Sequence, residues 1–274
     1  MHSEGTHKTI GIAGGMGPHS GTALFDLILD STHARLDQDY PSIILVSFPK
    51  SIPDRTLYLI GEEKINPAYQ ISAMIEKLYT AGAEVIGIAC NTAHAPAIYD
   101  VILRELDRKN IDVEMVDMLQ ETCRSIRIRY PGAKRVGIMA TNGTYRSGVY
   151  RELLAGMGYE AIIPDPVFQD SVIHKMIYDP DFGIKSCPTK IRDEVYALAD
   201  RAVEFFEQHN ADAIVIGCTE LSLLYREEAV RGIPLVDSLR SLAHALIRQA
   251  TAADYEPLKM QYDQLTGTRK RTAL

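Results

Sequence analysis

Two cysteines occupy equivalent places in two similar segments of the chain. Cys90 ends the segment Ala83-Glu-Val-Ile-Gly-Ile-Ala-Cys90, and Cys218 ends Ala211-Asp-Ala-Ile-Val-Ile-Gly-Cys218, 128 positions later. Each apolar run is typical of a buried strand, and a threonine follows each cysteine within two residues. We expect a helix to begin after each cysteine. Its N-terminus would favour a thiolate and move the thiol pKa from about 8.5 toward neutral.

Two acid–base groups of one kind, on opposite sides of a carbon atom, suit inversion of configuration. One thiolate would remove a proton from one face while the other thiol delivers a proton to the opposite face. The pair therefore predicts racemisation or epimerisation, provided that both thiols reach one site. A free cysteine is also commonly a small buried hydrophobe, and this alternative stays open. We expect that role for Cys123 and Cys187, which have no counterpart in the repeat.

The elements around the cysteines predict an α/β fold made of strand–helix units. Helical stripes such as Ile71, Met74, Ile75 and Leu78 alternate with short apolar runs. Alternation of this kind predicts parallel sheets flanked by helices, with ligands beyond the carboxyl ends of the strands. Seven runs are expected to be strands covered on both faces: Thr9–Ile12, Ile43–Ser47, Val85–Ala89, Val113–Val116, Val136–Met139, Ala213–Ile216 and Leu235–Val236.

The repeat extends beyond the cysteine segments. Residues 8–15 resemble residues 134–141, and Val116-Asp117 resembles Val236-Asp237, at nearly the same offset. We therefore predict two pseudo-symmetric lobes, each a mostly parallel sheet flanked by helices, with the active site in the cleft between them. The N-terminal lobe would span residues 1–117 and be completed by 232–274, and the C-terminal lobe would span 118–231. The polar tail after Thr251 is expected to be a solvated extension.

Composition and charge argue against several classes of protein. The 274 residues are 46% hydrophobic and 24% charged, as in a globular protein that buries a core. A net charge of −7 and a pI near 5.6 argue against nucleic-acid or anionic-membrane partners. No apolar run approaches the roughly 20 residues of a membrane-spanning helix, and the polar N-terminus has no signal-peptide core. The four cysteines are too few and too scattered for a disulfide scaffold, so we expect a cytoplasmic protein.

Motifs for cofactors and metals are not found. The loop Gly11–Gly17 follows a strand but lacks the spacing of a dinucleotide-binding fingerprint, and no Gly-Lys-Ser/Thr phosphate loop occurs. The eight histidines have no metal-ligand spacing, and no two cysteines are close enough for a zinc site. No lysine motif for pyridoxal phosphate stands out. We expect the protein to use no cofactor and no metal.

Six short motifs stand in order between Lys8 and Ala250: Gly14-Gly15-Met16-Gly17-Pro18, Pro53-Asp54-Arg55-Thr56, Cys90-Asn91-Thr92-Ala93-His94, Ala140-Thr141-Asn142-Gly143-Thr144-Tyr145, Ile184-Lys185 and Gly217-Cys218-Thr219-Glu220. Together they resemble the aspartate/glutamate racemase superfamily, and specifically its aspartate racemase branch. The resemblance implies a cofactor-independent amino-acid racemase that acts on a small-molecule substrate and forms a homodimer. Glutamate racemases carry an Asp-Ser-Gly box and a histidine where this chain has Met16 and Glu220, which favours aspartate.

The resemblance also implies a role for each site residue. Cys218 would act on the L-enantiomer and Cys90 on the D-enantiomer. Hydroxyl and amide groups would bind the α-carboxylate and the ammonium group, while Arg55 and Lys185 would grip carboxylates. The substrate-binding residues implied in this way are Met16, Arg55, Asn91, Thr92, Thr141, Thr144, Lys185 and Thr219.

Two neighbouring residues are candidates for tuning the thiolates. His94 lies four residues after Cys90, one helical turn away, and would either tune that thiolate or pack the first turn of a helix. Glu220 would act in the same way on Cys218. Alternative functions also stay open. These are a related racemase, isomerase or decarboxylase (for glutamate, varied amino acids, hydantoins or a diacid) and a protein that binds an amino acid without turnover.

Overall fold

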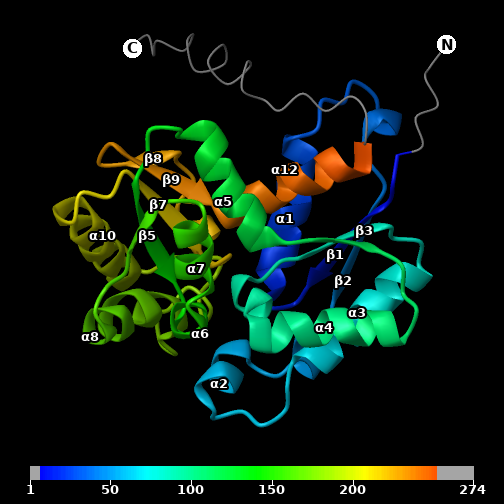
Figure 1. The fold of residues 1–274 in the computed structure, drawn as a ribbon, viewed down its shortest axis with the longest axis horizontal. Coiled ribbons are helices and arrows are strands. Elements are labelled where there is room, and N and C mark those ends of the chain that lie inside the picture. Colours follow the sequence, from blue (N-terminus) through cyan, green and yellow to red (C-terminus); the bar gives the residue numbers. More distant parts are fainter. Residues whose placement is uncertain (1–6, 252–274) are drawn as a thin grey trace.

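The computed structural model describes residues 7–251 and contains two sheets, each flanked by helices (Figure 1). The first sheet has the order β2-β1-β3-β4 and is parallel throughout. Its strands are β1 (Ile10–Gly14), β2 (Ile43–Ser47), β3 (Val85–Ile88) and β4 (Glu114–Val116). The second sheet has the order β6-β5-β7-β9-β8, and only its edge strand β8 is antiparallel. Its strands are β5 (Arg135–Ala140), β6 (Glu160–Ile162), β7 (Ala213–Gly217), β8 (Ala229–Val230) and β9 (Ile233–Asp237).

Helices connect the strands of each sheet. The first lobe contains α1 (Pro18–Asp30), α2 (Arg55–Ile60), α3 (Ala68–Thr80) and α4 (Pro96–Arg108). The second contains α6 (Asn142–Ser147), α7 (Val149–Gly156), α8 (Pro166–Phe168), α9 (Lys175–Tyr178), α10 (Asp193–Gln208) and α11 (Leu221–Leu224). Two further helices, α5 (Met118–Arg129) and α12 (Ser238–Thr251), pack against each other where the lobes meet (Figure 1). The predicted α/β class with two parallel-sheet lobes is therefore confirmed.

The strands form where the sequence is apolar on both faces. Every residue of β1 and of β7 is buried, as expected for central strands of a sheet covered by helices on both sides. All seven predicted strands are present, and their ends differ from the prediction by at most two residues. Two strands, β6 and β8, were not predicted.

The last part of the chain differs from the predicted lobe division. We expected residues from 232 onward to complete the first lobe, but β9 pairs with β7, with Leu235 opposite Ile214, and extends the second sheet. Only α12 packs against the first lobe, where it contacts α1 and β3. The tail after Thr251 lies outside the described residues.

One hydrophobic core connects the two lobes. It contains Ile12 and Leu24 of the first lobe, Val136 and Val215 of the second, and Leu242 of α12. Separate clusters pack α3 and α4 against the first sheet and α10 against the second. The shared core fixes the lobes relative to each other and so holds the ends of β3 and β7 in defined positions. None of the helices formed by residues 7–251 combines the length and apolar content needed to cross a membrane.

Candidate active site

Cys90 and Cys218 follow the carboxyl ends of equivalent strands, β3 and β7. Both are free and 5% exposed. They line one small cavity, to which the two lobes both contribute. The other residues that line this cavity are Met16, Arg55, Asn91, Thr92, Thr141, Tyr178, Lys185, Thr219 and Glu220. The structure therefore brings together all the predicted site residues except Thr144 and His94, which lie just behind the cavity wall.

Hydroxyl groups from both lobes meet at this cavity. Thr92 Oγ1 lies 3.1 Å from Thr141 Oγ1 and 3.0 Å from Thr144 Oγ1, so Thr144 supports the wall from behind. Thr141 is also the N-cap of α6. The close approach requires a glycine at position 143, because a Cβ atom there would lie 2.7 Å from the Thr92 methyl carbon.

Two of the remaining polar residues are held by hydrogen bonds across the molecule. Thr219 Oγ1 accepts a 2.8 Å hydrogen bond from Ser20 of α1. Asn91 donates to Ser238 Oγ at 2.9 Å and accepts from the Tyr150 hydroxyl at 2.6 Å. One Asn91 N–H is thus left for a ligand, and the rest of its side chain positions the loop after Cys90.

Arg55 is a buried cation with unused hydrogen-bonding capacity. It is 7% exposed, and its two terminal nitrogens donate to the carbonyl oxygens of Pro53 at 3.2 Å and Met16 at 3.3 Å. Its Nε is buried and has no partner. Burial opposes its charge, but the nearby Cys90 and Asp54 outweigh that effect and raise the pKa of Arg55. A buried guanidinium with a free N–H suits a carboxylate ligand.

Lys185 is already paired within the protein. Its ammonium group donates to Glu220 Oε1, and the Cys218 thiol donates to Glu220 Oε2 at 3.0 Å. Burial opposes ionisation of both partners, but the charge of each one stabilises the ionised form of the other. The pKa of Lys185 therefore lies above its usual range, and that of Glu220 lies below. Lys185 therefore reaches the cavity as half of an ion pair rather than as a free cation.

The expected lowering of the thiol pKa is wrong for Cys218. Burial, and then the negative charge of Glu220, raise its pKa well above the ordinary value. The helix that follows has only four residues, and Glu220 stands before it. The segment after Cys90 is likewise a short 3₁₀ turn, Asn91–His94, rather than the start of an α-helix. Neither thiol meets the N-terminus of a long helix.

His94 packs the turn after Cys90. Its Nδ1 lies 2.9 Å from the Cys90 carbonyl oxygen, and its Nε2 accepts from the Met118 N–H at 3.4 Å. Since Nε2 accepts, we assign the ring proton to Nδ1, which donates to Cys90. Burial lowers the pKa of His94 and keeps the ring neutral. Of the two roles considered for His94, these contacts favour packing.

Tyr178 lines the cavity but was not predicted from the sequence. It lies on α9 of the second lobe, and its hydroxyl donates across to Asp54 Oδ2 at 3.1 Å, beside α2 of the first lobe. The Lys185 ammonium nitrogen lies 5.2 Å from the centre of its ring. No motif marks this tyrosine, since its importance comes from contacts with residues distant in the sequence.

We expect Tyr178→Phe to loosen the contact between the lobes. The change removes one hydrogen bond to a carboxylate, worth about 1.5–3 kcal/mol, while Asp54 keeps its bonds from the backbone of Thr56 and Leu57. The free energy of unfolding, measured with a denaturant, should fall by about that amount. Tyr196→Phe, at an exposed position of α10, is the control and should change nothing. Equal stability of Tyr178→Phe and wild type would contradict the inter-lobe role.

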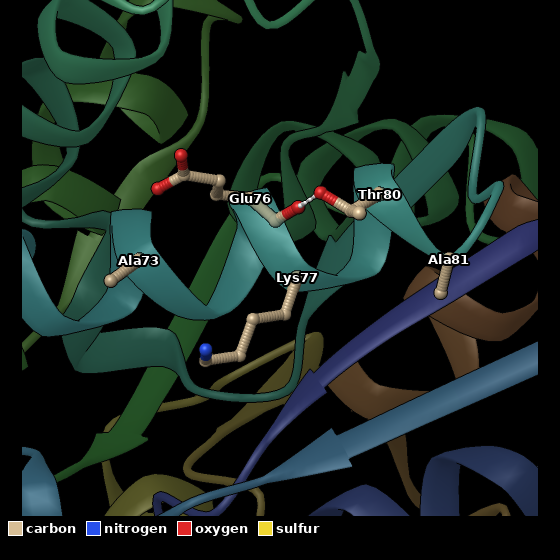
Figure 2. Close-up of a pocket in the computed structure, with 5 residues that line it drawn as sticks. All are labelled: Ala73, Glu76, Lys77, Thr80 and Ala81. Carbon is tan, nitrogen blue, oxygen red and sulfur yellow. Dashed lines mark hydrogen bonds between the residues drawn. The ribbon is translucent and has the colours of Figure 1, made fainter.

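A second hollow in the first lobe offers little chemistry. Figure 2 shows it on the outer side of α3, lined by Ala73, Glu76, Lys77, Thr80 and Ala81. The Thr80 hydroxyl donates a hydrogen bond to the Glu76 carbonyl oxygen, and the Glu76 carboxylate forms an ion pair with Lys109 at 2.5 Å. It contains no cysteine. The cavity between the lobes is therefore the candidate active site. Within residues 7–251, no three His, Cys, Asp or Glu side chains are grouped so as to hold a metal ion.

Comparisons with known proteins agree with this geometry. Residues 13–246 match the family model described as Asp/Glu/Hydantoin racemase. The broad specificity amino-acid racemase RacX of Bacillus subtilis is 30% identical over 243 residues, which cover 87% of this chain and 96% of that protein. The Picrophilus torridus aspartate racemase structure superposes with a TM-score of 0.73 at 28% identity, covering 89% of this chain and 94% of that one. A putative Asp/Glu racemase from Yersinia pestis gives a TM-score of 0.69 at 26% identity, covering 89% and 99%. The chain belongs to the Asp/Glu/hydantoin racemase family of enzymes.

Proposed function

We propose that this protein interconverts the enantiomers of an acidic amino acid, and that aspartate is its main substrate. Cys90 and Cys218 are the two acid–base groups, and no cofactor takes part. The observation that carries the proposal is that the two thiols, one from each lobe, line a single small cavity. Both thiols are buried, so a substrate bound between them displaces water, and the electrostatic interactions around it become stronger.

The proposed reaction transfers two protons. Starting from the D-enantiomer, the Cys90 thiolate takes the proton from Cα, and the electron pair of the C–H bond stays on carbon. The S–H bond of Cys218 then breaks with its electrons staying on sulfur, and its proton joins Cα from the opposite face. The L-enantiomer reacts by the same steps in reverse. The assignment of each thiol to one enantiomer follows the family resemblance.

The carbanion-like charge on Cα is the main energetic difficulty. Without an electron sink, donors on the α-carboxylate must stabilise that charge directly. The hydroxyl groups of Thr92 and Thr141 line the cavity and suit this role, whereas the Thr219 hydroxyl already donates to Glu220. Arg55 has a buried Nε without a partner, whereas the charge of Lys185 is paired with that of Glu220, so Arg55 suits a side-chain carboxylate.

A second candidate is racemisation of a wider range of amino acids. The relative of Bacillus subtilis that is 30% identical over most of both chains is named for broad specificity. One methylene changes selectivity by only about 1–3 kcal/mol, so related side chains are weakly separated by size alone. Initial rates on D- and L-aspartate, glutamate and several neutral amino acids distinguish the two candidates.

The proposal is tested by incubating the protein with L-aspartate in deuterated water. We expect D-aspartate to appear, and deuterium at Cα, since the proton returned to carbon comes from a thiol that exchanges with solvent. A protein that neither inverts aspartate nor incorporates deuterium contradicts the aspartate version. The same measurement on the other amino acids then decides whether any substrate of this class is used.

We further propose that the protein is a homodimer, as the family resemblance implies. The chain has a mass of 30.4 kDa, so light scattering of the purified protein should give about twice that value. A mass equal to one chain at working concentrations would contradict the dimer and leave the proposed reaction untouched.

A further inference from the structure

The two thiols of the cavity have neighbours of opposite charge. On the first-lobe side, the guanidinium of Arg55 interacts with Cys90. On the second-lobe side, the Cys218 thiol donates directly to the Glu220 carboxylate at 3.0 Å. The repeat makes the cysteines equivalent by position, but these neighbours make them different electrostatically.

Glu220 is held as an anion in a site built by both lobes. It is 5% exposed, and besides Cys218 it accepts from the Gly17 N–H at 3.1 Å, the Thr219 hydroxyl at 3.3 Å and the Lys185 ammonium group. A carboxylate with several donors and an adjacent cation remains ionised even when it is buried.

The glycine at position 17 is part of this arrangement. A Cβ atom there would lie 3.2 Å from Glu220 Oε1, closer than most side-chain carbons approach, so a larger residue would displace the carboxylate. Gly17 comes from the loop after β1, whereas Lys185 and Thr219 come from the second lobe. The close fit therefore fixes Glu220 against Cys218 from two sides.

We propose that Glu220 is a positioning residue that makes the two thiols inequivalent: it holds Cys218 in the protonated form, so that the substrate-free protein presents Cys218 as the proton donor. This inference rests on the proposed two-thiol racemisation. In the resting form the protein is then prepared for the enantiomer whose Cα proton faces Cys90. After that turnover, Cys218 is a thiolate next to the Glu220 carboxylate, and Cys90 carries the proton taken from Cα. Before the next turnover of the same kind, Cys218 must regain a proton and Cys90 must lose one.

The other charged groups at the cavity do not cancel this effect. Lys185 favours the thiolate form of Cys218, but its charge is matched by that of Glu220. Tyr178 faces Lys185, and burial raises the pKa of its phenol, so it stays neutral at ordinary pH. Asp54, which accepts from the Tyr178 hydroxyl, and Arg55 belong to the first lobe.

Racemisation rates alone cannot reveal the inequivalence. Two enantiomers have equal free energies, so kcat/KM must be equal in the two directions whatever the resting form. The test is therefore a titration of each thiol in the substrate-free protein. Alkylation is followed over a range of pH, with mass spectrometry of the peptides that contain each cysteine, because only the thiolate reacts.

The expected result is specific to one thiol. In a Cys90→Ser background, Glu220→Gln should lower the midpoint pH for alkylation of Cys218 by about one unit or more, because Lys185 then faces the thiol unpaired. In a Cys218→Ser background, the same change should leave the midpoint of Cys90 unaltered. Glu220→Asp keeps the charge and should give a midpoint between those of Glu220 and Gln.

Three results would overturn the inference. They are an unaltered Cys218 midpoint in Glu220→Gln, an equal shift at both thiols, and a Glu220→Asp midpoint that matches that of Glu220→Gln. A loss of structure would also change alkylation of the buried Cys123, which serves as the folding control in every sample. The titration uses no substrate, so it can be read even if the protein has no racemase activity. A shift of the alkylation midpoint at Cys218 alone, in a protein without that activity, would support the role of Glu220 and contradict the proposed function.

Discussion

Replacement of either Cys90 or Cys218 by serine should slow net interconversion of the enantiomers by a large factor. Each turnover needs one group to take a proton and another to give one, and a hydroxyl is a far weaker acid than a thiol. General acid–base catalysis typically contributes roughly 10²- to 10⁴-fold in rate, so a loss of that size is expected for each variant. The rate is measured by following the appearance of the opposite enantiomer with chiral chromatography.

The two variants should differ in hydrogen exchange at Cα. Each keeps one thiol, which still removes and returns a proton on one face of the substrate. Cys218→Ser should therefore incorporate deuterium from solvent into the D-enantiomer without inverting it, and Cys90→Ser into the L-enantiomer. Mass spectrometry of each recovered enantiomer provides the measurement. A variant that exchanges both enantiomers equally would contradict the two-thiol mechanism.

Cys187→Ser is the matched control for these variants. Cys187 is half-buried and is not among the residues that line the cavity, and its sulfur lies 3.8 Å from the Asp181 carbonyl oxygen. The racemase activity of the Cys187→Ser variant should equal that of the wild-type protein. If Cys90→Ser or Cys218→Ser retained full activity, the catalytic groups would have to be others in the cavity.

The fold could be predicted from the sequence because its central strands have a simple pattern. β1 and β7 are apolar on both faces, so they stand out as short hydrophobic runs between helical stripes. The unpredicted strands β6 and β8 have three and two residues, lie at or near sheet edges, and include exposed positions. Such short strands are determined by the partners they pair with rather than by a run of their own.

The position of β9 shows a limit of the repeat argument. The match between Val116-Asp117 and Val236-Asp237 identified two equivalent strand ends correctly, since β4 and β9 each pair with the strand that precedes a cysteine. The assignment of β9 to the first lobe was wrong because the chain crosses between lobes only at the strand's end, where α12 begins. A crossing of that kind leaves no mark in local hydrophobicity.

The site was predictable in its residues but not in their pairing. Internal similarity identifies Cys90 and Cys218, and the motifs identify Arg55. That Glu220 pairs with Lys185, 35 positions away, depends on how the loops of the second lobe fold together. The expected effect of helix N-termini on the thiols assumed α-helices where the chain forms short turns, and it omitted burial, which is the largest influence on Cys218.

Arg55→Lys should weaken the use of aspartate far more than that of a neutral amino acid. Lysine keeps the charge but cannot form two parallel hydrogen bonds to one carboxylate. Hydrogen bonds to charged groups are worth about 1.5–3 kcal/mol each, so the loss of one corresponds to a fall in kcat/KM of roughly 10- to 150-fold. The fall should appear mainly in KM if Arg55 binds the side-chain carboxylate, because that group takes no part in the bond changes at Cα.

The comparison between substrates shows which carboxylate Arg55 binds. A neutral amino acid that the wild-type protein accepts has only the α-carboxylate, so its kcat/KM should change little in Arg55→Lys. An equal fall for both substrates would contradict the assignment to the side chain and place Arg55 on the α-carboxylate. Arg108→Lys is the control, because Arg108 is exposed on α4 and pairs with Glu105 far from the cavity lining. Its kinetics should match those of wild type, so a specific loss in Arg55→Lys reflects the buried guanidinium and its free N–H.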